Sequence, residues 1–162
     1  MAYTIRNAEN QDLERIEQIY AYARSFMVKT GNPNQWGKTT PAHEQLVQDI
    51  LEKKLFVVED SSGIHGVFYF WIGEDPTYRV IEQGSWRSSE VYGTIHRIAS
   101  DGSGGILTAA KEFTLNRIRH IRIDTHHDNH VMQKALDKLG FHPCGVIYIA
   151  DGSPRLAYDY LA

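Results

Sequence analysis

The stretch from Val91 to Ile106 constrains the fold of this chain more than any other. It reads VYGTIHRIASDGSGGI, in which an alternating, β-prone run leads into a glycine-rich turn and then into the start of a helical pattern. A helix that begins directly after such a turn leaves backbone N–H groups without an intrahelical acceptor. These donors and the positive end of the helix dipole favour an anion. The stretch therefore predicts a strand, a turn and a helix, with an anion site at the turn.

The segment after this helix predicts a second strand parallel to the first. In HIRIDTH, the residues Ile121, Ile123 and Thr125 alternate with polar neighbours. A strand, a helix and a strand in succession form a right-handed crossover with parallel strands. Ligands of such sheets bind beyond the carboxyl ends of the strands. The glycine-rich turn lies at that end.

The remaining elements follow from apolar periodicity and turn residues. Helices are predicted from Leu13 to Met27, from Pro41 to Leu51 and from Asn129 to Leu139, and further strands at 3–6, 55–59, 66–72, 145–149 and 156–161. Asn10 and Thr40 are expected to cap the first two helices, and Asp128 or Asn129 the last. Gly140 is expected to end that last helix. The stretch 78–89 has no clear pattern.

Composition favours one cytoplasmic domain spanning residues 1–162. The apolar fraction of 42% and charged fraction of 23% are ordinary for a globular protein. The net charge is −3, and the absence of a basic stripe argues against a nucleic-acid partner. Cys144 is the single cysteine, which suits a reducing compartment. The longest apolar run, 66–73, is too short to span a membrane, and the first residues lack an apolar signal core.

Three segments resemble the GNAT superfamily of acyl-CoA N-acyltransferases. They are TIRNAENQDLERI, HRIASDGSGGI and IRIDTHHDNHVMQKALDKLGF. The resemblance covers the whole chain and implies an α/β (α+β) fold of three layers. In that fold a mixed sheet of about seven strands is flanked by four helices, and strands 4 and 5 are parallel and splayed. Gly105 matches the middle glycine of the superfamily's phosphate motif, but Gly102 stands where Arg or Gln is usual, and Leu107 where a small residue is usual.

The resemblance implies acetyl-CoA as co-substrate, with its diphosphate on the glycine-rich turn and its pantetheine arm between strands 4 and 5. The backbone of Ile98 and Ala99 would face the arm on one side, and Asn129 and Met132 would contact it on the other. The expected diphosphate site consists of Ser100, Gly102, Ser103, Gly104, Gly105 and Ile106. Two alternatives stay open: the glycines form a plain turn, and Asn129 is only a helix cap.

Acetylation of an amine requires a proton acceptor. A primary amine with a pKa near 10 is neutral in only about one part in a thousand at pH 7. The candidates are His126 at the end of strand 5, His96 on strand 4 and Glu90 before strand 4. Each of these residues could equally be a packed or surface side chain. The superfamily often has a tyrosine acid three residues before Leu139-Gly140-Phe141, where this chain has Leu136.

Aromatic residues are expected to line the acceptor pocket. The pocket is expected to be built by the first two helices, their loop and the region 73–90. The aromatic candidates for it are Trp36, Tyr69 and Trp86, with Trp71 as a further one. Aromatic rings suit an aliphatic amine or its cation. The alternative is that these rings belong to the core, which is least expected for Trp36 in its polar loop.

Two further reactive groups are expected to play no part. His126, His127, Asp128 and His130 match no zinc spacing, and neighbouring strand residues point to opposite faces, so no metal site is predicted. Cys144 could carry an acetyl group, but no partner histidine and acid are evident, so a buried, inert thiol is expected.

The functional hypothesis is an acetyl-CoA-dependent N-acetyltransferase that acts on a small amine, an amino acid or a peptide by direct attack in a ternary complex. The alternative is a non-catalytic GNAT-like module that binds CoA as a sensor. A small nucleotide-binding or interaction domain is a third reading, although no Lys-Ser or Lys-Thr pair follows the glycines. No nucleic-acid or membrane partner is expected, and a homodimer is left open.

Overall fold

The computed structural model describes residues 2–162. Its elements, in chain order, are β1 (Thr4–Asn7), η1 (Asn10–Asp12), α1 (Leu13–Lys29), α2 (His43–Leu51), β2 (Leu55–Asp60), β3 (Gly63–Ile72), η2 (Pro76–Tyr78), β4 (Gly93–Ser100), α3 (Ile106–Leu115), β5 (His120–Thr125), α4 (His130–Lys138), β6 (His142–Tyr148) and β7 (Pro154–Leu161). The two η elements are short 3-10 helices. The predicted strands and helices are all present, with ends shifted by a few residues.

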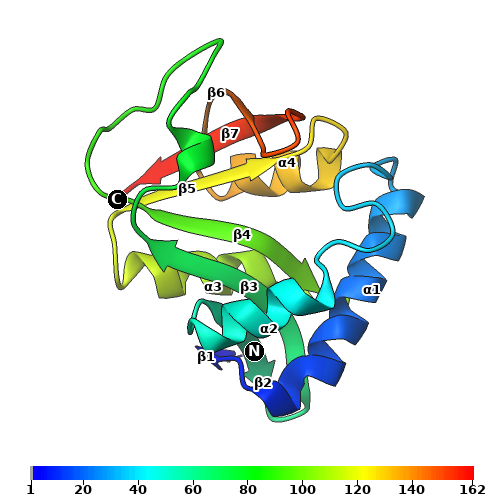
Figure 1. The fold of residues 1–162 in the computed structure, drawn as a ribbon. Coiled ribbons are helices and arrows are strands. Elements are labelled where there is room, and N and C mark those ends of the chain that lie inside the picture. The colour runs from blue at the N-terminus through cyan, green and yellow to red at the C-terminus, as the bar shows by residue number, and fades with distance from the viewer. Residues whose placement is uncertain (1) are drawn as a thin grey trace.

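The strands form one mixed sheet in the order β1-β2-β3-β4-β5-β7-β6 (Figure 1). All neighbours are antiparallel except β4 and β5, which run parallel as the crossover predicts. Helices α3 and α4 pack on one face of the sheet, and α1 and α2 pack on the other. The expected GNAT-like arrangement of seven strands and four helices is therefore confirmed.

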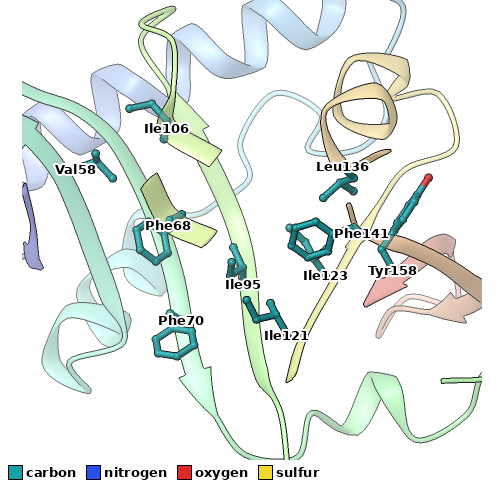
Figure 2. Close-up of a cluster of buried hydrophobic side chains, with 11 residues drawn as sticks. Val58, Phe68, Phe70, Ile95, Ile106, Ile121, Ile123, Leu136, Phe141 and Tyr158 are labelled. Carbon is teal, nitrogen blue, oxygen red and sulfur yellow. The ribbon is translucent and has the colours of Figure 1, made fainter. Parts of the chain in front are cut away.

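The larger core lies between the sheet and the helices α3 and α4. Figure 2 shows Phe70, Ile95 and Ile121 next to one another on β3, β4 and β5. Ile106 and Leu136 close this core from the helix side, and both are almost fully buried. These apolar side chains hold the two helices whose first turns face the carboxyl ends of β4 and β5.

A missing side chain brings α3 close to the sheet. A Cβ atom built on Gly66 of β3 would lie 2.6 Å from the side chain of Ile106, the first residue of α3. Only glycine therefore allows this approach. The contact fixes where α3 begins, and so where the glycine-rich turn lies.

Two predicted caps are wrong and one is confirmed. Asn10 lies inside η1, and the backbone N–H of Glu9 is bound instead by Asp12, at 2.8 Å. Thr40 does not cap α2, because the helix begins at His43 and its N-cap residue is Ala42. Which residue caps a helix therefore depends here on the tertiary contacts of the preceding loop, and not only on residue type.

The predicted start and end of α4 are both confirmed. The Asn129 side chain accepts a hydrogen bond from the backbone of Met132 at 3.0 Å. Gly140 has a positive φ of 86°, and the N–H of Phe141 returns to the carbonyl of Leu136. None of the helices within residues 2–162 is long and apolar enough to cross a membrane.

Candidate functional site

The gap between β4 and β5 is the central feature of the site. The two strands pair at only two positions, Gly93 with Ile121 and Thr94 with Arg122. Beyond Thr94 they diverge towards their carboxyl ends, as the green and yellow arrows in Figure 1 show. Because a strand edge without a partner leaves backbone donors and acceptors open, the facing edge of β4 can bind an extended ligand.

A β-bulge interrupts β4 beside this gap. Val67 pairs with Ala99 and Tyr69 with His96, so two residues of β4, Arg97 and Ile98, lie opposite one residue of β3. Arg97 has a positive φ of 50°, and its carbonyl accepts a hydrogen bond from the Tyr20 hydroxyl at 2.7 Å. Bulges of this kind re-aim backbone groups and are frequent next to active sites.

The turn after β4 presents a row of free amides. The N–H groups of Gly102 and Ser103 are bound by side chains within the turn. No acceptor among residues 2–162 binds the next five backbone N–H groups, those of Gly104, Gly105, Ile106, Leu107 and Thr108. Gly105 reaches the helix start with φ of +83°, a conformation that favours glycine. This is the geometry of an anion site at the start of a helix.

His96 and two carboxylates meet at the closed end of the gap. The Nε2 atom of His96 lies 2.7 Å from Oδ2 of Asp75, and its Nδ1 atom lies 3.7 Å from Oδ1 of Asp124 on β5. The Tyr78 hydroxyl donates to the same Asp124 oxygen at 2.6 Å. Tyr69 stacks beside the imidazole, with ring centroids 5.6 Å apart. We call these five residues the His96 cluster.

The charges of the His96 cluster follow from burial and hydrogen bonding. Burial would raise the pKa of Asp75, but hydrogen bonds from His96 and Thr77 outweigh it and bring that pKa down to about 2. Asp75 is therefore ionised at neutral pH. Burial raises the pKa of Tyr78 well above its usual value, so this hydroxyl remains a donor.

Asp75 decides which nitrogen of His96 is free. An ionised carboxylate only accepts, so the Nε2 atom facing it carries a proton. In the neutral ring Nδ1 then holds the lone pair, and this atom faces β5, where Oδ1 of Asp124 lies at 3.7 Å, beyond hydrogen-bond distance. An imidazole oriented by a carboxylate in this way is suited to general-base chemistry.

The other two proposed bases lie outside the His96 cluster. His126 follows the end of β5, is 8% exposed, and its Nδ1 accepts the backbone N–H of Asp128 at 3.0 Å. Burial and the nearby Arg155 lower its pKa. Glu90 is exposed in the segment before β4 and lines a separate cavity of about 610 Å³. No hydrogen bond or ion pair within residues 2–162 joins either one to His96, and their catalytic roles stay predictions.

The geometric argument against a metal site is wrong. Because β5 ends at Thr125, strand alternation does not reach His126 and His127, whose rings stack with centroids 4.3 Å apart. Together with Asp128 they place possible ligand atoms within 4.8 Å of one another. Part of that set is engaged, since Nδ1 of His126 accepts a backbone hydrogen. The absence of a metal stays a prediction.

The predicted aromatic residues separate into different places. Tyr69 alone joins the His96 cluster. Trp36 packs edge-on against Tyr20, with centroids 5.5 Å apart, and Trp86 covers the Arg122 guanidinium at 4.2 Å. Trp71 is 38% exposed. Trp86 also donates a hydrogen bond from Nε1 to the carbonyl of Tyr78 at 3.0 Å, and it lines the same cavity as Glu90. The expected role of Trp36 and Trp86 in acceptor binding stays a prediction.

The loop after α1 connects the two sides of the gap. Gln35 in this loop accepts hydrogen bonds from Asn129 at 2.9 Å and Thr125 at 3.4 Å. Asn129 therefore caps α4 and reaches towards the gap at the same time. The signal in the sequence for Asn129 was its cap position, whereas nothing in the sequence indicated Gln35.

Cys144 and Leu136 both lie outside the His96 cluster. Cys144 is buried, and burial together with Asp159 raises its pKa to about 12, so its thiol is an inert group as predicted. Leu136, at the position where the superfamily often has a tyrosine, is fully buried in the core. A proton donor is therefore absent from that position.

Solved structures of acetyltransferases resemble this chain over its whole length. An acetyltransferase of the GNAT family from Streptococcus agalactiae is 29% identical, with a TM-score of 0.88 over 99% of this chain and 95% of that one. One from Listeria monocytogenes is 16% identical, with a TM-score of 0.71 over 99% and 95%. The yncA protein of Salmonella typhimurium, solved with its cofactor acetyl-CoA, is 15% identical, with a TM-score of 0.61 over 99% and 94%.

No protein-family model matches the sequence, and neither does any curated protein. The assignment therefore depends on the fold. The mixed seven-stranded sheet, the splayed β4 and β5 and the open amides at the start of α3 are features of this chain that do not depend on the similar structures. Together with those structures, they identify this chain as having the fold of the GNAT superfamily of acyl-CoA N-acyltransferases.

Proposed function

We propose that this chain transfers an acetyl group from acetyl-CoA to a primary amine, with residues 1–162 acting as one domain. The similar structures are acetyltransferases, and one of them contains acetyl-CoA. The observation that carries the proposal is the His96 cluster: an imidazole held by Asp75 at 2.7 Å, with its second nitrogen turned into the closed end of the gap.

The cofactor fits the residues that are present. The five free amides from Gly104 to Thr108 would hold its diphosphate, and the open edge of β4 would hold its pantetheine arm. Acetyl-CoA supplies an acetyl group activated as a thioester. Bound along β4, that group would lie near the closed end of the gap, where the His96 cluster is.

His96 provides the base that the amine needs. The charged amine first gives one proton to Nδ1 of His96. Its neutral nitrogen then bonds to the acetyl carbon, the carbon–sulfur bond breaks, and the second proton of the nitrogen passes to water. Asp75 stabilises the imidazolium that results. The thiolate of CoA leaves without a side-chain acid at Leu136, and it can take its proton from water.

The chemistry around His96 favours a cationic, aliphatic acceptor. Asp75 and Asp124 are carboxylates, and Tyr69 and Tyr78 present aromatic rings within about 6 Å of the imidazole centroid. Carboxylates and ring faces both attract an ammonium group. An amine can thus arrive charged and lose its proton next to the base.

The test is release of free thiol from acetyl-CoA with a panel of primary amines, comparing wild type with His96→Gln. We expect kcat to fall about 100-fold in the variant, the usual contribution of a general base. The residual rate should rise with pH, because solvent then deprotonates the amine. His142→Gln, at an exposed histidine on β6, is the matched control. Undiminished turnover in His96→Gln contradicts the proposal.

A non-catalytic CoA sensor is the second candidate. The absence of a proton donor at Leu136 and of the usual cation at Gly102 favours it. The same assay separates the two functions when CoA binding is measured by calorimetry in parallel. A sensor binds CoA but releases no thiol with any amine of the panel.

A further inference from the structure

A second histidine is linked to the diphosphate turn. His65 lies on β3, with its Nδ1 atom 2.8 Å from Oδ2 of Asp101 and its Nε2 atom 2.9 Å from Oδ1 of Asp60. Asp101 is the first residue after β4 and precedes the first open amide, that of Gly104, by three residues. Arg15 of α1 donates to the same Asp101 oxygen at 2.7 Å.

The geometry requires that both nitrogens of His65 carry protons. Ionised carboxylates only accept hydrogen bonds, and one faces each nitrogen of the ring. The hydrogen bond that His65 donates to Asp101, and to a smaller extent the one it donates to Asp60, raises the pKa of His65. The Ser62 hydroxyl, 2.7 Å from Nε2, can turn to suit either state.

Protonation of His65 decides the local charge. Arg15 and protonated His65 balance the two carboxylates Asp60 and Asp101, whereas neutral His65 leaves a net charge of −1. The remaining neighbours are uncharged, except for Glu112, which lines the same cavity of about 730 Å³ on α3. Tyr3 contributes its ring at 6.3 Å and a hydroxyl that donates to the carbonyl of Gly104.

This charge lies where a diphosphate would bind. Asp101 holds the turn through its Oδ1 atom, which accepts the N–H of Ser103 at 3.0 Å. An uncompensated carboxylate here would repel a bound phosphate. The chain has Gly102 where the superfamily usually has a positively charged or amide side chain, so compensation has to come from outside the turn.

We propose that His65 is a positioning residue for the diphosphate of CoA, which holds Asp101 and cancels its charge while the imidazolium persists. The inference rests on the proposed function, because it takes CoA as the ligand. Its consequence is an affinity for CoA that falls as the pH rises and His65 loses its proton.

The experiment is calorimetric titration of CoA into wild type and His65→Gln from pH 6 to pH 9. We expect the variant to bind about tenfold more weakly at pH 6, as one partly screened charge would produce, and equally at pH 9. The phosphates of CoA also titrate near pH 6, but they do so equally for both proteins. The ratio of the two dissociation constants therefore reports His65 alone.

His65→Lys is the rescue variant. It keeps a positive charge across the whole range, so its advantage over His65→Gln should stay at about tenfold from pH 6 up to pH 9. His142→Gln should follow wild type at every pH. A ratio of wild type to His65→Gln that is constant with pH, or equal to one throughout, overturns the proposal. If wild type binds no CoA at any pH, the proposed function fails as well; if it acetylates amines and only the ratio is flat, this inference alone fails.

Discussion

Replacement of Asp75 by Asn tests the assignment of His96 most directly. Oδ1 of Asp75 accepts the backbone N–H of Thr77 at 2.9 Å and its hydroxyl at 2.7 Å, while Oδ2 faces Nε2 of His96. In Asp75→Asn the amide oxygen must stay towards Thr77, because the backbone N–H and the hydroxyl of Thr77 both donate to that position. The NH₂ group then takes the place of Oδ2 and points at His96.

This orientation of the amide reverses the tautomer of the His96 imidazole. Because the amide donates, Nε2 has to accept, and the proton moves to Nδ1, the atom that faces the gap. The lone pair that would take the amine proton is lost. A hydrogen bond to a charged group contributes about 1.5–3 kcal/mol and a neutral one about 0.5–1.5 kcal/mol. The difference of about 1–1.5 kcal/mol predicts roughly a tenfold loss from this bond.

Loss of the correctly placed base adds to that effect, so we expect kcat to fall between about 10-fold and 100-fold. The affinity for CoA should not change, because Asp75 is remote from the open amides of the turn. Asp151→Asn is the matched control, since Asp151 also accepts a backbone N–H two residues ahead, in the exposed turn before β7. Steady-state thiol release, with calorimetry for CoA, provides the measurements. Activity of Asp75→Asn within twofold of wild type would refute the role given to Nδ1 of His96.

Three further predictions concern stability and the thiol. Gly66→Ala should lower the free energy of unfolding, measured in urea, by about 1–3 kcal/mol, because the new Cβ would lie 2.6 Å from the Ile106 side chain. Gly104 has open space around it, so Gly104→Ala should change that free energy by less than about 1 kcal/mol. Equal effects of the two substitutions would contradict the packing argument. Burial would raise the pKa of Asp159, but its hydrogen bonds lower that pKa to about 2, so its contribution to stability is complete above pH 4 and lost as the pH falls towards 2. Acid titration of the unfolding free energy should show this loss, and Asp159→Asn should flatten it; an unchanged acid slope in the variant would count against this carboxylate as the cause. Cys144→Ala should keep kcat within about twofold, because the thiol remains protonated, and a loss of turnover with intact CoA binding would restore an acetyl-cysteine route.

The fold was predictable from the sequence because local patterns and global topology agree in this chain. Alternation in β4 and β5, the glycine-rich turn and the apolar stripe of α3 each depend on residues close in the chain. They specify a parallel pair whose carboxyl ends meet a helix start. The predictions that Asn10 and Thr40 cap helices were wrong, because contacts with distant parts of the chain decide the conformation of those loops.

The site was predictable only in part. The sequence indicated that backbone amides would gather before Ile106, because that follows from the turn itself. It also named His96, but only as one of three candidate bases. The partner Asp75 is 21 residues away in a segment with no regular pattern, and Asp124 comes from another strand. Likewise Asp101, one of the two carboxylates that bind His65, is 36 residues away, in the turn after β4.

The sequence by itself determined the order of elements, the parallel pair and the place of the open backbone amides, since hydrogen bonding along the backbone depends on near neighbours. Only the tertiary structure decided which histidine meets a carboxylate and which nitrogen it leaves free. Side-chain pairing of this kind depends on distances between segments far apart in the chain, and these exist only once the sheet has assembled.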